Sequence, residues 1–339
     1  MKKLNLLNRL VVILNSIFAA LLLCSYVLPY IFPRSFPSLS VLTLVVPILI
    51  FINLLFLIYW TIKFKKQFLI SFLVLLFGYK HVSSLFKFSG KDEESASSLK
   101  IMTYNVRLFN LYEWIDNHDI GDDIVDLIKD QNIDIVCLQE FHNKKEGAFS
   151  YPYKYFKYNS TTNRVGQAIL SKYPIINNGS LNFSRYGNNA IFADIVKGKD
   201  TIRVYNLHLQ SFHINPKQEE LTQENSERLL NRMGSAFVVQ QEQAEIFENH
   251  RRLCHYKQII CGDFNNTQYS NVYKQIKGDM NDTFDEAGSG FGRTYYYKYF
   301  PLRIDFILVD KNIEVLSHKT LTDKIMSDHY PIVSSLNID

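Results

Sequence analysis

Polar side chains that could take part in catalysis or metal binding lie at the ends of strand-like runs in the second half of the chain. The sharpest case is QIICGDFNNT (258–267), where an apolar run passes through Gly262 directly into Asp263 and Asn265. The other candidates at such ends are Asn105, Glu140, His208, Asp305, Asp328 and His329. Each has an ordinary alternative, since Gly, Asp and Asn also end strands as simple turns. Because a carboxylate is costly to bury without partners, their recurrence at strand ends favours one shared site.

The residue types in this set suit a particular chemistry. Carboxylate and amide oxygens are ligands for Mg²⁺, Mn²⁺ or Ca²⁺, whereas zinc would call for cysteines and clustered histidines. The four cysteines show neither a metal nor a redox spacing. Two histidines and an orienting carboxylate supply proton transfer. Together with a hard cation that neutralises phosphoryl oxygens, they are equipped for the attack of water on a phosphate ester.

An alternating series of strands and helices must position these side chains. Apolar runs predict strands at 100–106, 133–140, 167–174, 190–196, 201–209, 258–264, 304–310 and 330–338. Helical patterns cover 121–131 and about 217–251. Many strands with interspersed helices predict an α/β or α+β layered domain, but the pattern leaves parallel and antiparallel pairing open.

The motifs TYNVR, LQE, NLHL, GDFNNT, RIDFIL and SDHYPI follow one another along residues 99–339. In this order and spacing they resemble the endonuclease/exonuclease/phosphatase superfamily, the DNase-like metal-dependent phosphoesterases. The resemblance implies a two-sheet β-sandwich flanked by helices. It also implies a hydrolase that uses Mg²⁺ or Mn²⁺.

The resemblance also implies a role for each motif residue. Glu140 resembles the principal metal ligand, and Asn105 lies close by in the metal and phosphate shell. Asp263 resembles the residue that orients or deprotonates the attacking water, and is counted with the metal site. The remaining assignments are Asn265 as the amide that fixes the phosphate and Asp263, His329 as general acid/base, Asp305 as its orienting carboxylate, His208 as stabiliser of the phosphoryl oxygens, and Asp328 as a second-shell or second-metal carboxylate. No motif position is visibly lost.

The first 88 residues lie outside this resemblance and predict a membrane region. Three transmembrane helices are expected, at about 10–32, 38–62 and 67–86, because a span needs roughly 20 apolar residues. The third contains Lys80 and His81 and is the weakest of the three; without it the chain would cross twice. Basic residues cluster before the first span and at 63–66, which predicts a cytoplasmic location for both. Three crossings then place the catalytic domain on the periplasmic or extracellular side.

A polar, Ser-rich linker is expected at 89–98, with the catalytic domain at 99–339. Residues 1–98 contain 10 Lys and Arg against 3 Asp and Glu, so the totals of 37 and 33 leave 27 and 30 for the rest, a net charge of −3. This balance argues weakly against a domain that grips long nucleic acid.

The resemblance, with its complete set of motif residues, implies a phosphoesterase. Together with the apolar N-terminal region and the net charge of −3, it favours a membrane-tethered phosphodiesterase or phosphomonoesterase, acting on a lipid head group or a small phosphoester. An endonuclease or exonuclease acting on DNA or RNA is the alternative, and a non-catalytic membrane-held binding protein is a third. No obligate protein partner can be inferred. Specificity is expected in the loops 141–166, 211–217 and 286–301, where tyrosines could stack on a base or sugar or simply pack the loop.

Overall fold

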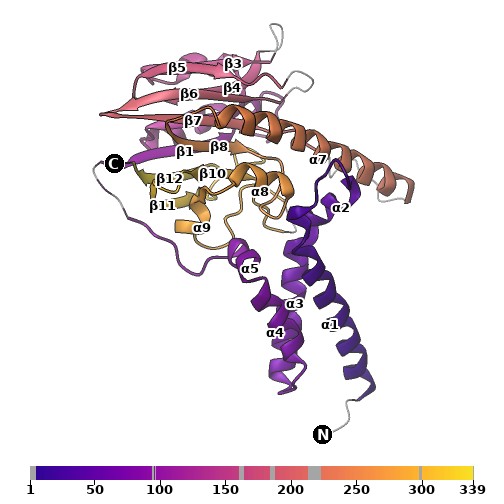
Figure 1. Ribbon diagram of the computed structural model, residues 1–339. Coiled ribbons are helices and arrows are strands. Elements are labelled where there is room, and N and C mark those ends of the chain that lie inside the picture. Colours follow the sequence, from indigo (N-terminus) through magenta and orange to yellow (C-terminus); the bar gives the residue numbers. More distant parts are fainter. Residues whose placement is uncertain are drawn as a thin grey trace.

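The computed structural model describes residues 5–93, 95, 97–159, 164–183, 188–212, 223–297 and 300–338. Two six-stranded sheets face one another in the second half of the chain, and helices cover their outer faces (Figure 1). The two-sheet fold that the sequence predicts is confirmed.

The first sheet runs in the order β11-β12-β1-β2-β4-β3 and the second in the order β5-β6-β7-β8-β10-β9. The strands of the first sheet are β1 (Leu99–Asn105), β2 (Ile135–His142), β3 (Tyr153–Tyr158), β4 (Val165–Ser171), β11 (Glu314–Thr320) and β12 (Ile332–Asn337). Those of the second are β5 (Ile175–Ser180), β6 (Ala190–Lys197), β7 (Asp200–His208), β8 (Lys257–Asp263), β9 (Asn281–Asp282) and β10 (Asp305–Val309). All eight expected strands are present; β3, β5, β9 and β11 were not expected.

Burial on both faces explains why the central strands are continuously apolar. In β8, Ile259 and Cys261 point into the core between the sheets, while Ile260 points to the outer face. That outer face is covered by α7 (Gln223–Arg251) and α8 (Asn271–Lys277), and α6 (Ile120–Asp130) covers the first sheet. The expected helix at 121–131 is therefore α6. The helix expected at about 217–251 is α7, and its residues 217–222 lie outside the described part of the chain.

Strand direction brings the candidate residues to one edge. The β1–β2 and β7–β8 pairs are each parallel, and the contact of Asn105 at the end of β1 with Asp263 at the end of β8 places the ends of all four strands at the same side. β10 and β12 run antiparallel to their neighbours and therefore begin at that side. The register aligns His208 with Asp263, and Asp263 with Asp305, directly across the second sheet.

The first part of the chain forms an antiparallel helical stalk below the sheets (Figure 1). Its helices are α1 (Leu6–Ser25), α2 (Pro37–Val41), α3 (Val46–Ile62), α4 (Phe68–Phe77) and α5 (Tyr79–Leu85), with the short turns η1 (Leu28–Tyr30) and η2 (Leu42–Val45). Two segments are long and apolar enough to cross a membrane, Leu6–Tyr30 with mean hydropathy 2.4 and Pro37–Ile62 with 3.0. The expected third span is a pair of helices, α4 and α5, bent by 83° at Gly78.

Buried polar contacts join the helices of the stalk. Asn15 of α1 donates to the hydroxyl of Ser71 in α4 at 2.6 Å, and Ser71 donates to Asn53 of α3 at 3.2 Å. Such bonds stabilise helix association where water is absent. At the bend, a side chain on Gly78 would overlap the Tyr26 ring, with a Cβ only 2.0 Å from it.

The stalk and the sheets form several direct contacts. Arg34, between α1 and α2, pairs with Glu245 of α7 at 3.0 Å, and Asn271 of α8 donates to the Pro29 carbonyl. The segment expected as a linker at 89–98 lies along the catalytic domain: Asp92 forms a β-bridge with Ser317, and Lys87, just before the segment, forms one with Gly290. The 28–45 connection and the end of α5 thus meet the catalytic domain, while the start of α1 and residues 63–66 lie at the far end of the stalk (Figure 1).

Candidate active site

Glu140 owes its position to an irregularity in β2. The pairing of β2 with β4 shifts register between Leu138 and Phe141, so β2 carries one extra residue there. Glu140 lies within this bulge at a positive φ of 48°, a conformation that non-glycine residues seldom adopt. Bulges of this kind re-aim a side chain, and here the Glu140 carboxylate accepts from the Asn105 amide at 3.2 Å.

Gly262 allows β8 to end in the Asp263 carboxylate close beside β7. Its φ is 142°, and a Cβ at this position would lie 2.0 Å from the Leu207 carbonyl of β7. Only glycine fits this close approach, and Asp263 follows it immediately. Asn265, at a φ of 49°, then holds Asp263: its backbone amide donates to one carboxylate oxygen at 2.8 Å and its side chain to the other at 3.2 Å.

His329 and Asp305 form a buried pair at the same edge. The Nδ1 atom of His329 lies 2.9 Å from the nearer Asp305 oxygen, so Nε2 faces the site. Thr294 accepts from the backbone amide of Asp305 at 3.1 Å, and the Tyr295 ring packs edge-on against His329 with centroids 5.1 Å apart. Side chains of the loop before β10 therefore hold the pair in place.

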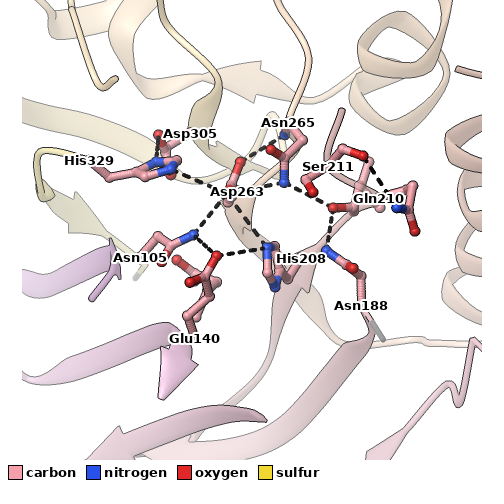
Figure 2. A network of polar contacts seen from close by, with 12 residues as sticks. Asn105, Glu140, Asn188, His208, Gln210, Ser211, Asp263, Asn265, Asp305 and His329 are labelled. Atoms are coloured by element: carbon pink, nitrogen blue, oxygen red, sulfur yellow. Dashed lines mark hydrogen bonds and ion pairs between the residues drawn. The ribbon is translucent and has the colours of Figure 1, made fainter. Parts of the chain in front are cut away.

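These groups converge on one oxygen of Asp263 (Figure 2). Asp263 Oδ2 accepts from the Asn105 amide at 3.0 Å and lies 3.7 Å from Nε2 of both His208 and His329. His208 Nε2 is also 3.8 Å from the Glu140 carboxylate. One network thus joins seven of the eight residues that the sequence singled out, and they come from both sheets.

The electrostatics of the network favour a cation. Burial raises the pKa of Asp263 to about 7, against the opposing effect of His329. Burial is the main cause that raises the pKa of Glu140, and repulsion from Asp328 is the second, although 34% of the Glu140 side chain remains exposed to solvent. Burial alone would lower the pKa of His329, but the carboxylates of Asp305 and Asp263 outweigh it and raise this pKa well above its usual value. A positive charge bound nearby would stabilise the ionised form of these buried carboxylates.

The donor set fits a hard divalent cation. Atoms of Asp263, Asp305 and His329 lie within 4.8 Å of one another, and the Glu140 carboxylate borders the same space. The predicted ligand Asn105 turns its nitrogen toward the two carboxylates, while its oxygen accepts from the Arg107 backbone at 3.1 Å. The assignments of Glu140, Asn105, Asp263 and Asp328 as ligands remain predictions.

Asp328 lies at the edge of the site, outside the network around Asp263. Its carboxylate is 3.3 Å from Arg107, whose guanidinium stacks on Trp114 at 4.3 Å from the ring centre. Ser327, beside Asp328, donates to the Asn105 carbonyl at 2.8 Å and so ties the segment before β12 to the end of β1. Arg107 stands in the TYNVR motif, but nothing in the sequence indicates its pairing with Asp328.

Sequence reasoning missed the residues that support the site. Asn188 donates to the Leu209 carbonyl at 2.7 Å, and Gln243 of α7 accepts from the Gln210 backbone at 2.9 Å. Deeper in the sandwich, Asn206 of β7 accepts from Gln139 of β2 at 2.6 Å. Asn206 and Gln139 are polar residues within apolar strands, and this contrast was a sequence signal for buried polar contacts. Their pairing could not be predicted, because it depends on how one sheet packs against the other. Of the expected specificity loops, residues 160–163, 213–217 and 298–299 lie outside the described part of the chain.

Comparisons with known proteins bear on both parts of the chain. Residues 102–329 match the Endonuclease/Exonuclease/phosphatase family, and residues 8–85 match a domain of unknown function (DUF8431). None of the curated proteins matches the chain.

Similar solved structures include a mannosyl-6-phosphatase of Bacteroides thetaiotaomicron, at 19% identity and a TM-score of 0.54 over 71% of this chain and 100% of that one. The human Nocturnin catalytic domain with a bound sulfate has 18% identity and a TM-score of 0.53, over 73% of this chain and 97% of that one. D. rerio TDP2 with a single-strand DNA product has 16% identity and a TM-score of 0.51, over 71% and 99%. At these identities the likeness concerns the fold.

Proposed function

The chain belongs to the endonuclease/exonuclease/phosphatase family, and on that premise we propose that it is a membrane-tethered phosphoric ester hydrolase that works with a divalent cation. The observation that carries the proposal is the convergence of Glu140 and His208 with the Asp305–His329 pair around one buried carboxylate, Asp263. This combination supplies a place for a cation, a proton acceptor and a charged imidazole within one network of contacts.

In this proposal each side chain has a separate task. Asp263 accepts the proton of the attacking water, for which a pKa of about 7 is suited at neutral pH. His329, kept protonated by Asp305, stabilises negative charge on the phosphoryl group and can donate a proton to the leaving oxygen. Asn265 holds Asp263 by two bonds, and His208 faces the phosphoryl oxygens from the opposite side.

The cation would be Mg²⁺ or Mn²⁺, held by Glu140 with Asn105 beside it, and with Asp263 and Asp328 as the other predicted acidic residues. Oxygen donors of this kind suit these ions. When bound, the ion neutralises charge on the phosphoryl oxygens and polarises the ester.

We further propose that the catalytic domain lies on the periplasmic or extracellular side. The basic residues Lys63, Lys65 and Lys66 and the start of α1 lie at the end of the stalk opposite the catalytic domain (Figure 1). If the positive-inside tendency places these ends in the cytoplasm, an odd number of crossings follows, with α4 and α5 completing the third. Lys2 and Lys3, which contribute to the same tendency, lie outside the described residues.

A reporter fusion after residue 95 tests the sidedness. Alkaline phosphatase should be active at this position, and a fluorescent protein that folds only in the cytoplasm should be dark. The opposite pattern would overturn this sidedness.

A nuclease remains the competing proposal. The aromatic pair Tyr112 and Trp114 favours a nuclease, because exposed rings can stack on bases. Their ring centroids are 5.4 Å apart, and Arg107 links Trp114 to Asp328. The net charge of −3 over residues 99–339 disfavours a grip on long nucleic acid.

The deciding experiment is a panel assay of the full chain in detergent with Mg²⁺. The substrates are DNA, RNA, phospholipids, inositol phosphates and a generic phosphodiester. Hydrolysis of any ester that is lost with EDTA and restored by Mg²⁺ or Mn²⁺ supports the proposal, and the preferred substrate separates esterase from nuclease. Full activity after exhaustive chelation would refute the cation's role, and inactivity on every ester would favour the non-catalytic binding protein.

A further inference from the structure

An apolar cavity lies where the stalk meets the catalytic domain. Its volume is about 720 Å³, within the range of roughly 300–1,000 Å³ that is usual for ligand sites. The walls come from three separate parts of the chain: Leu54 of α3, Val82 of α5 with Phe88 beyond it, and the catalytic loop residues Phe291 and Phe300. Among the residues that line it, Lys87 is the one with a formal charge.

The surroundings of the cavity are those of a membrane interface. Phe88 is 97% exposed and Tyr79 is 67% exposed, although both side chains are large and apolar or aromatic. Phe51 of α3 lines the cavity and is also 52% exposed on the stalk surface. The cavity wall is therefore continuous with the surface that faces lipid if α3 crosses the membrane.

Water is a poor occupant of such a space. A stable buried water needs two to four polar partners, and the lining offers mainly hydrocarbon and aromatic rings. A lipid chain has no such requirement. Because lipid tails are as apolar as leucine, a chain can pass from the bilayer into the cavity at little cost. Affinity and selection would then come from the polar end of the lipid, for which half-buried Lys87 offers a positive charge.

The loop that closes the cavity also contacts the proposed catalytic pair. Phe291 and Phe300 stand on either side of Thr294 and Tyr295 in this loop. Thr294 accepts from the Asp305 backbone at 3.1 Å, and Tyr295 packs on His329. One short segment therefore borders both the cavity and the Asp305–His329 pair.

We propose that this cavity binds a hydrocarbon chain of a membrane lipid, and that the phosphate ester which the enzyme hydrolyses is carried by that lipid. The second part rests on the proposed phosphoesterase function, and the first part does not. The substrate class is an amphiphile whose anionic phosphate reaches the catalytic pocket while one chain stays in the cavity.

Two neighbouring leucines of α3 provide a matched pair of variants. Leu54 lines the cavity, whereas Leu55 does not and is 51% exposed on the stalk. Leu54→Trp should fill the space, and Leu55→Trp adds the same bulk outside it. Neither residue belongs to the catalytic pocket, so hydrolysis of a water-soluble ester should be unchanged in both, which also reports that each variant is folded.

The binding arm uses the full chain in vesicles that contain phosphatidic acid with a photoactivatable diazirine at the chain end. After illumination, mass spectrometry should find adducts on Val82 or Phe291, and these should be lost in Leu54→Trp but kept in Leu55→Trp. Adducts confined to the outer faces of α1 and α3, or equal labelling of the cavity in both variants, would overturn the cavity assignment. This readout does not depend on catalysis.

The activity arm compares phospholipid esters that have the same head group on short, water-soluble chains or on long chains. Leu54→Trp should lower the ratio of long-chain to short-chain hydrolysis by about tenfold or more, which corresponds to roughly 1.4 kcal/mol of lost interaction. Leu55→Trp should leave the ratio unchanged. An unaltered ratio in Leu54→Trp would overturn the lipid substrate, and so would a wild type that cleaves another ester of the panel but neither phospholipid. Inactivity on every ester would refute the proposed function and leave the cavity to be judged by the adducts.

Discussion

Replacing Asn206 by leucine should weaken the contact between the two sheets that carry the halves of the site. Asn206 is fully buried in β7, and its side-chain amide donates to the carbonyls of Leu138 and Ala168 at 2.9 and 3.0 Å. Its oxygen accepts from Gln139 at 2.6 Å. All three partners belong to the opposite sheet, so the substitution removes every one of these bonds between the sheets.

The size of the effect follows from those three bonds. At about 0.5–1.5 kcal/mol net each, and with buried carbonyls left without this donor, the loss is roughly 3–5 kcal/mol in the free energy of unfolding. For a domain of this size, each kcal/mol corresponds to about 2–4 °C, so the midpoint of thermal unfolding should fall by roughly 6–20 °C. Activity per folded molecule should fall as well, because Glu140 and His208 lie on different sheets and only 3.8 Å apart.

The assay is thermal unfolding of the full chain in detergent, followed by circular dichroism, with Asn178→Leu as the control. Asn178 is exposed on β5, so its substitution should change stability by no more than about 0.5 kcal/mol. If Asn206→Leu melts within about 3 °C of the wild type, or no lower than the control, the contacts between the sheets do not contribute in the way argued here.

The remaining predictions concern the chemistry and the pH dependence. His329→Ala should lower turnover of the preferred ester by roughly 10²–10⁴-fold, and Asp305→Asn should also lower it because it removes the negative charge beside Nδ1; a near-normal rate in His329→Ala would mean that another group transfers the proton. Glu140→Gln should raise the Mg²⁺ concentration needed for half-maximal activity, and an unchanged metal titration would exclude Glu140 as a ligand. Burial lowers the pKa of His318 to about 3 from 6.5, so the unfolded chain binds an extra proton between these values and stability should fall as the pH drops below about 6.5. At about 1.4 kcal/mol per pH unit, His318→Gln should reduce the loss in melting temperature between pH 7 and pH 5, and an identical loss in both proteins would contradict this account.

Much of the fold could be predicted from the sequence because its signals are local. The apolar runs and the Gly-Asp boundary at 262–263 arise from neighbouring residues, and all eight expected strands formed. The strands that escaped prediction were more polar and partly exposed, as β3 and β5 show, and an exposed strand needs no apolar run. Similarly, α4 and α5 together have the composition of one span, but the structure bends them by 83°, and at the bend Gly78 leaves room for the ring of Tyr26, which follows α1.

The sequence by itself determined the residue types of the site and their order along the chain. Only the tertiary structure decided which of them meet, because contacts between distant residues depend on strand direction and register. Parallel pairing of β7 with β8 and antiparallel pairing of β8 with β10 align His208, Asp263 and Asp305, and the bulge in β2 turns Glu140 toward them. The cavity at the stalk was likewise hidden from the sequence, since its walls come from three segments that only folding brings together.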